Sequence, residues 1–156
     1  MAAIYLYCGD NTVEVQYKGE VHKLSLNQLY DKVKSEEWDI LELKAKTLNG
    51  AFTNIYGITV IAVDNVHKIN KITTKSGRAV TCEDYGRFLC DDGEVIYSKS
   101  TYKLLGHSVV ITDKTTDKVI SIDRIGYLGM LYGVYTDDNY IAVNDIVCLT
   151  GMEVEP

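Results

Sequence analysis

The sequence predicts a mostly β fold with one short helix. Short segments that alternate polar and apolar residues recur along the chain, at spacings of roughly 8–12 residues. The 156 residues include a single proline, a residue that removes a hydrogen-bond donor from a sheet. One segment instead repeats its apolar residues with the period of a helix. The length suits a single domain over residues 1–156.

The first two strands form a predicted hairpin. Residues 12–17 alternate polar and apolar side chains, Lys18-Gly19-Glu20 supplies a turn, and residues 21–24 return as the second strand. This pattern places a β-hairpin near the start of the chain.

The helix follows this hairpin directly. Ser25 is a favourable N-cap, and Gln28 stands three residues later as its capping-box partner. The apolar side chains that then share one helix face are Leu26, Leu29, Tyr30 and Val33. The sequence therefore predicts a helix over about 25–34 that packs on a sheet.

The rest of the chain reads as short strands joined by polar turns. The expected strands are 39–45, 55–63, 66–73, 78–82, 95–97, 108–112, 118–122, 133–135, 140–143 and 145–148. Within 35–53 we expect a loop insertion, formed by residues 35–38 and 47–53. Gly57, Gly126, Gly129 and Gly133 would permit bends or bulges in the long strands.

Charge and composition exclude several classes of protein. The net charge of −6 and the pI of about 5.0 argue against a broad nucleic-acid-binding surface. No apolar run approaches the roughly 20 residues of a membrane span, and the N-terminus lacks the basic and apolar regions of a secretory signal. We therefore expect no membrane association and an intracellular, cytoplasmic location.

The cysteines and histidines show no metal-binding pattern. Cys8, Cys82, Cys90 and Cys148 form no CxxC pair, and the three histidines lie far from them in sequence. We expect reduced, mostly buried thiols and no metal. The acidic run 91–94 lacks the ligand spacing of a calcium loop, so a solvated turn is the preferred interpretation.

Phosphate-binding and hydrolase motifs are also absent. The sequence contains no GxxxxGK[ST], GxGxxG, HExxH or GxSxG segment. We therefore expect no cofactor.

Twelve tyrosines suggest a protein-binding surface, because tyrosine offers a large contact area at a low entropic cost. Tyr5 and Tyr7 would share one face of a strand, and Tyr127, Tyr132 and Tyr135 cluster in a second stretch. Packing within strands, where tyrosine is common, is the alternative interpretation.

Four segments follow one another along the chain in a telling order: residues 9–15 with the following helix, 75–85, 92–110 and 133–147. In this order they resemble the Hint domains of inteins and hedgehog autoprocessing proteins. Residues 9–15 with the following helix resemble the opening block, and 75–85 resemble the second. Residues 92–110 resemble the next stretch, and 133–147 the two closing blocks. The resemblance covers roughly residues 6–150 and implies a horseshoe of bent β-hairpins with one short helix.

The residues that would catalyse splicing are missing from the positions that the resemblance indicates. The nucleophile that opens the family's sequence falls on Leu6, and the histidine of the second block falls on Tyr85. The closing His-Asn falls on Leu149 and Thr150. If the opening strand were shorter, Cys8 could be the acyl acceptor and Cys148 the second nucleophile.

Three functions remain open at this point. The first is a non-catalytic structural or protein-interaction module on a degenerate intein-like scaffold, which contacts a partner or itself through exposed tyrosines and edge strands. A phage accessory protein, incorporated into a virion, is a more specific form of it that no residue demonstrates. The second is a self-processing splicing element that uses Cys8. A small-ligand-binding β domain is a further option that needs an apolar pocket.

Overall fold

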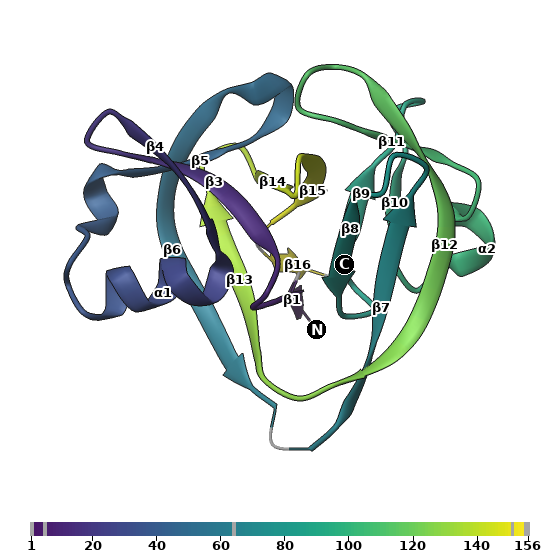
Figure 1. Ribbon diagram of the computed structural model, residues 1–156, viewed down its shortest axis with the longest axis horizontal. Helices are drawn as coiled ribbons and strands as arrows, with labels where there is room; N and C mark the ends of the chain where they lie inside the picture. The colour runs from purple at the N-terminus through teal and green to yellow at the C-terminus, as the bar shows by residue number, and fades with distance from the viewer. Residues whose placement is uncertain (1, 5, 64, 151, 155–156) are drawn as a thin grey trace.

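The computed structural model describes residues 2–4, 6–63, 65–150 and 152–154. Almost all strands join one antiparallel sheet that bends into a horseshoe (Figure 1). Two long antiparallel strand pairs make its arms: β6 (Phe52–Ala62) pairs with β13 (Met130–Thr136), and β7 (His67–Thr74) pairs with β12 (Thr116–Tyr127). The mostly β, horseshoe-shaped fold that the sequence and the resemblance predict is confirmed.

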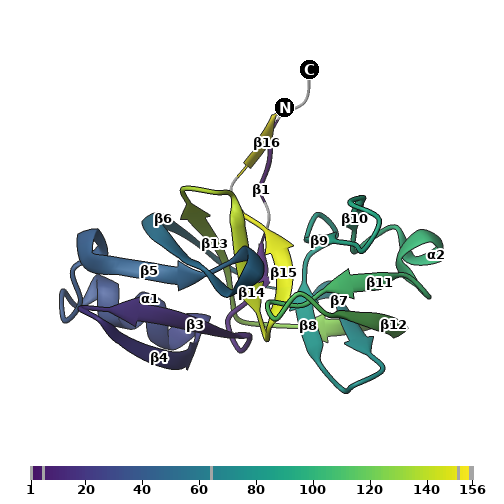
Figure 2. The ribbon, with the colours of Figure 1, turned by 90° about the horizontal axis from the view of Figure 1, so that it is seen from above.

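The arms divide the molecule into two lobes (Figure 2). The first lobe adds the strands β3 (Thr12–Tyr17), β4 (Glu20–Ser25) and β5 (Leu43–Lys46). The second adds β8 (Ala79–Cys82), β9 (Arg87–Leu89), β10 (Val95–Tyr97) and β11 (Ser108–Val110). The strands β2 (Tyr7–Cys8), β14 (Tyr140–Val143) and β15 (Ile146–Leu149) lie between the lobes. Beyond the horseshoe, β1 (Ala2–Ile4) and β16 (Met152–Val154) pair with each other and project from one face.

The predicted first hairpin and helix are both present. Strands β3 and β4 are joined by Lys18 and Gly19, which have positive φ angles of 49° and 85°. Helix α1 spans Leu26–Lys34, and the Ser25 side chain accepts a hydrogen bond from the Gln28 backbone N–H at 3.1 Å. The Gln28 side chain accepts one from the Ser25 N–H, which completes the capping box. Local sequence signals alone were sufficient to locate these elements.

The segment 35–53 differs from its prediction. Strand 39–45 was expected, but residues Ile40–Glu42 form a 3₁₀ turn because the Asp39 side chain accepts a hydrogen bond from the Leu41 N–H. Strand β5 is extended and pairs with both β3 and β6, and Phe52 and Thr53 already belong to β6. The segment is therefore not a loop throughout, since its middle is a strand of the main sheet.

The structure contains more helical segments than the one helix that the sequence predicts. A short second helix, α2 (Thr101–Leu104), and a 3₁₀ turn at Leu48–Gly50 are present in addition to α1. Helix α2 has one turn and no side-chain cap, so the sequence carries no strong signal for it. Neither helix of the described chain has the length and apolar character needed to cross a membrane.

The core joins both lobes. One large apolar cluster runs from α1, through β3 and β5, to β9 and β15, and includes Leu29, Leu43, Phe88 and Ile146, each about fully buried. Gly57 lies beside a register shift in the β6–β13 pairing, where an added Cβ would stand 3.4 Å from the Tyr135 ring. This is a bulge of the kind the sequence predicts at Gly57.

Candidate functional site

The segments that the resemblance singles out meet at the centre of the molecule. Strand β2 lies between β13 and β8, so that Tyr7 pairs with Tyr132 on one side and with Cys82 on the other. The Glu83 backbone N–H donates to the Leu6 carbonyl at 3.1 Å. The Tyr7 hydroxyl donates to the Leu149 carbonyl at 2.7 Å. The fold therefore brings the first, second and closing segments together.

Leu6, at the predicted nucleophile position, has an apolar environment. Its side chain is 6% exposed and belongs to a small cluster with Cys8, Ile69 and Leu131. A leucine side chain has no atom that can attack a carbonyl. Leu6 is therefore a packing residue at this place.

The two alternative nucleophiles, Cys8 and Cys148, are fully buried free thiols. Burial raises the pKa of Cys8 to about 12, despite an opposing hydrogen bond with Thr81. Burial also raises the pKa of Cys148 well above its usual value, and the nearby Cys82 adds to this effect. Because the thiolate is the reactive form, both groups are poor nucleophiles at neutral pH. All four cysteines are free and buried, as the sequence predicts.

The loop after β8 holds the position expected for the catalytic histidine. The Tyr85 side chain is exposed, with its ring edge-on to Tyr97 at 5.8 Å and under the Lys99 ammonium at 4.4 Å. A Thr-x-x-His spacing counted from Thr81 ends at Asp84, one residue before Tyr85. The assignment to Tyr85 is therefore corrected to Asp84, and neither residue carries an imidazole.

A polar network surrounds Asp84. Its carboxylate accepts hydrogen bonds from Arg124 at 2.7 Å and from the buried Asn70 at 3.1 Å. The same Asn70 amide donates to Ser98 at 3.0 Å, and the Ser98 hydroxyl donates to the Glu83 carbonyl. These partners hold the loop in place and leave the Asp84 carboxylate in an ion pair.

His67 supplies an imidazole close to this loop. Its Nε2 lies 3.9 Å from the Glu83 carboxylate, and both residues line a pocket of about 350 Å³ with Asp84 and Arg124. Burial raises the pKa of Glu83, and His67 opposes the shift. The sequence indicates His67 only as a surface or half-buried strand residue and gives no sign that it and Arg124, from β7 and β12, meet at this loop. Only knowledge of the β7–β12 pairing could have placed them there.

The closing positions are also without catalytic groups. Thr150 is 3% exposed; its N–H donates to the Asn139 carbonyl at 2.9 Å, and its Oγ1 lies 3.3 Å from the Thr136 hydroxyl. Leu149 is half-buried, and it contacts the Tyr7 hydroxyl through its backbone carbonyl and not through its side chain. A threonine has no side-chain amide that could cyclise to cleave the chain.

The predicted tyrosine surface is only partly accessible. Tyr7 and Tyr132 are buried because their side chains pack into the large apolar cluster, so the expectation that they are exposed is not met. Tyr127 and Tyr135 are half-buried; Tyr127 donates to the Met130 carbonyl, and Tyr135 accepts from Thr59. Tyr5 lies outside the described residues.

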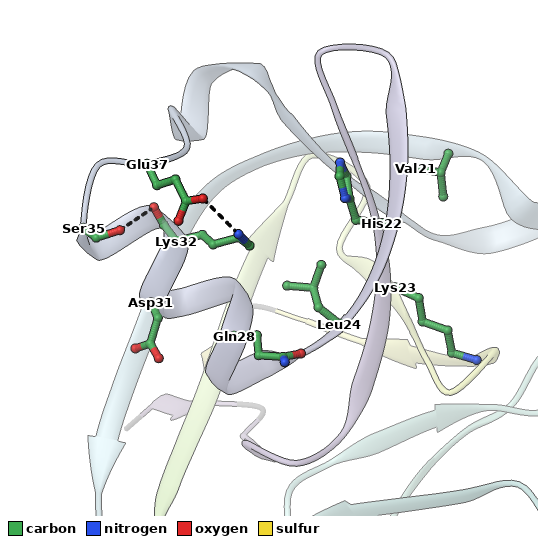
Figure 3. Close-up of a pocket in the computed structure, with 9 residues that line it drawn as sticks. All are labelled: Val21, His22, Lys23, Leu24, Gln28, Asp31, Lys32, Ser35 and Glu37. Atoms are coloured by element: carbon green, nitrogen blue, oxygen red, sulfur yellow. Dashed lines mark hydrogen bonds and ion pairs between the residues drawn. The ribbon is translucent and has the colours of Figure 1, made fainter.

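An open cavity lies away from this centre. It measures about 770 Å³ and lies between β4 and α1, as Figure 3 shows. An ion pair at 3.2 Å joins two of its lining residues, Lys32 and Glu37, and the Val21 and Leu24 side chains lie on the β4 side. None of the predicted site residues lines it.

Comparisons with known proteins agree with this geometry. Neither a protein-family model nor a curated protein sequence matches the chain. Among solved structures, an intein from a hyperthermophile matches with a TM-score of 0.77 and 14% identity, over 94% of this chain and 99% of that one. The chain has the intein fold. The VidaL intein matches with a TM-score of 0.76 and 13% identity, over 96% and 99% of the two chains.

A DnaB intein from Synechocystis sp. PCC 6803 is similar at a TM-score of 0.71 and 16% identity, over 97% of this chain and 99% of that one. These intein-like matches span nearly the whole of each chain, so the resemblance read from the sequence is confirmed for the fold. Identities this low carry no residue roles across.

Proposed function

We propose that this intein-like chain is a non-catalytic structural or protein-interaction module. The observation that carries the proposal is the site at Leu6. Where the resemblance expects a nucleophile, a leucine packs in an apolar cluster, and the thiol nearest in sequence, Cys8, is fully buried with its pKa raised to about 12. The groups expected to protonate and cleave the chain are replaced by Asp84, Leu149 and Thr150.

A fusion experiment tests this proposal against self-processing. The full chain is placed between two reporter domains of different mass, and the products are followed on a denaturing gel and by intact mass. We expect only the unprocessed fusion, while an active intein in the same fusion serves as the positive control. A spliced or cleaved product that is lost in Cys8→Ala would establish the alternative, a splicing element with Cys8 as acyl acceptor.

The partner-binding surface is proposed to include the stretch 127–135. Its support is exposed apolar area: Leu128 is 64% exposed and Met130 is 43% exposed, and Met130 pairs with the exposed Ala62 of β6. Light scattering of the wild type and of a Leu128→Asp, Met130→Asp variant tests self-association. We expect the variant to be less associated, with Leu41→Asp, at a distant exposed leucine, as the control.

The more specific hypothesis places the protein in a phage particle. It rests on the intein-like scaffold, on which a protein-binding role is proposed. Mass spectrometry of purified virions from the source of the chain would decide it, and absence of the chain from every particle preparation would reject it.

A further inference from the structure

A cluster of three potential metal ligands lies at the tip of the second lobe. Asp92 belongs to the turn between β9 and β10, Glu94 ends that turn, and His107 follows α2. One ligand atom from each residue lies within 4.8 Å of the other two. The sequence separates His107 from the acidic pair by more than ten residues, which is why no ligand spacing is visible in it.

The histidine is oriented as a metal ligand. His107 Nδ1 lies 2.8 Å from the Lys103 carbonyl, an acceptor, so that this nitrogen must carry the ring proton. The lone pair of the neutral ring is then on Nε2, which lies 3.5 Å from Asp92 Oδ2. A backbone carbonyl that fixes the tautomer in this way is the usual outer-shell partner of metal-binding histidines.

Asp92 is oriented in a comparable way. Its Oδ1 accepts a hydrogen bond from the Glu94 N–H at 2.9 Å, which leaves Oδ2 directed toward the histidine. Both segments have a fixed backbone. The Cys90 N–H donates to the Glu94 carbonyl, and the His107 N–H and carbonyl bond to Leu104 and Val119. The Asp92 carboxylate and the His107 ring are thus oriented by main-chain contacts before any ion binds.

Lys103 supplies the positive charge at this cluster. Its ammonium forms an ion pair with the Glu94 carboxylate. A divalent ion bound between the three ligands would neutralise the Glu94 carboxylate in place of Lys103. The exposed Lys103 side chain would then turn toward solvent.

We propose that Asp92, Glu94 and His107 form a binding site for a divalent transition-metal ion of the zinc class. One imidazole with two carboxylates and a water suits four-coordinate zinc, whereas magnesium and calcium prefer oxygen ligands alone. The bound ion would connect the β9–β10 turn to the segment that leads into β11. The site is independent of the self-processing question, since none of its residues lies in the central cluster around Leu6.

The test is calorimetric titration of the full chain with zinc chloride, in a buffer with a non-chelating reductant. We expect one site in the wild type. Loss of an outer-shell partner alone weakens metal binding about 10–100-fold, so loss of the ligand in His107→Ala should weaken it at least about tenfold. His107→Gln, which retains a polar side chain without the imidazole, should do the same.

Two further variants sharpen the test. His67→Ala removes another exposed histidine beside a glutamate and should bind zinc as the wild type does. Lys103→Met removes the competing ammonium and should bind zinc more tightly. Zinc should raise the unfolding temperature of the wild type and of His67→Ala but not of His107→Ala.

Three results would overturn the proposal: no binding at millimolar zinc, undiminished binding in both His107 variants, or equal binding of magnesium. Far-ultraviolet circular dichroism confirms that each variant is folded, so that a loss of binding reports on the ligands.

Discussion

Asp117 illustrates how a single residue fixes a turn of the second lobe. Its carboxylate is 7% exposed and accepts hydrogen bonds from Thr74 at 2.7 Å, from Arg78 at 2.9 Å and from both the N–H and the hydroxyl of Ser76. Burial disfavours the charged form, but these donors outweigh it and lower the pKa of Asp117 from 3.8 to about 2. The ionised carboxylate therefore stabilises the β7–β8 turn.

We expect Asp117→Asn to lower the free energy of unfolding at pH 7 by about 2 kcal/mol, the value that corresponds to this pKa shift. The folded-state pKa lies below the unfolded one, so the stabilisation is present above about pH 4 and is lost as the pH falls toward 2. Urea denaturation at pH 7 and at pH 3 measures the effect. Asp123→Asn, at an exposed position of β12, is the control, and an equal loss in both variants would contradict the assignment.

At the scale of elements, the sequence predicted those whose signals are local. The β3–β4 hairpin has its two-residue turn, and α1 has its capping box and one apolar face. The 3₁₀ turn at Ile40–Glu42 was missed because Asp39 bonds to its own backbone two residues on, a contact that competes with an extended conformation. The length of β12 was underestimated, because buried and exposed residues alternate only weakly in the half of the strand that faces solvent.

The capping box gives a prediction for α1. Ser25→Ala removes the side-chain acceptor for the Gln28 N–H, and an N-cap of this kind contributes about 1 kcal/mol. We expect the free energy of unfolding to fall by about that amount. Ser35→Ala, at the other end of the helix, removes only a longer contact of 3.3 Å to the Lys32 carbonyl and should cost less. Denaturation by urea compares the two, and a larger loss in Ser35→Ala would refute the capping argument.

At the scale of the whole molecule, the resemblance predicted the horseshoe, but the sequence could not show which side chains face its centre. Tyr7 and Tyr132 looked like surface residues because strand alternation does not reveal whether both faces of a strand are covered. The same limit applies to the metal ligands, since His107 meets Asp92 only through the fold of the second lobe. Contacts between distant segments were therefore the part that required the structure.

Tyr7 is the clearest of these distant contacts. Strand β2 has only two residues, yet Tyr7 links the first part of the chain to the last through its 2.7 Å hydrogen bond to the Leu149 carbonyl. Burial raises the pKa of Tyr7 well above 10, so the hydroxyl remains a donor at all ordinary pH values. Removing this donor would leave the carbonyl of β15 without its side-chain partner.

We expect Tyr7→Phe to lower the free energy of unfolding by about 1–2 kcal/mol, because the ring still fills its space while the partly buried acceptor loses its hydrogen bond. Tyr102→Phe, at a fully exposed ring, should leave stability unchanged. Equilibrium denaturation of both variants measures the difference. If Tyr7→Phe were as stable as the wild type, the hydroxyl would contribute nothing to joining the ends of the chain, and packing of the ring between β13 and β8 would have to account for the closed horseshoe.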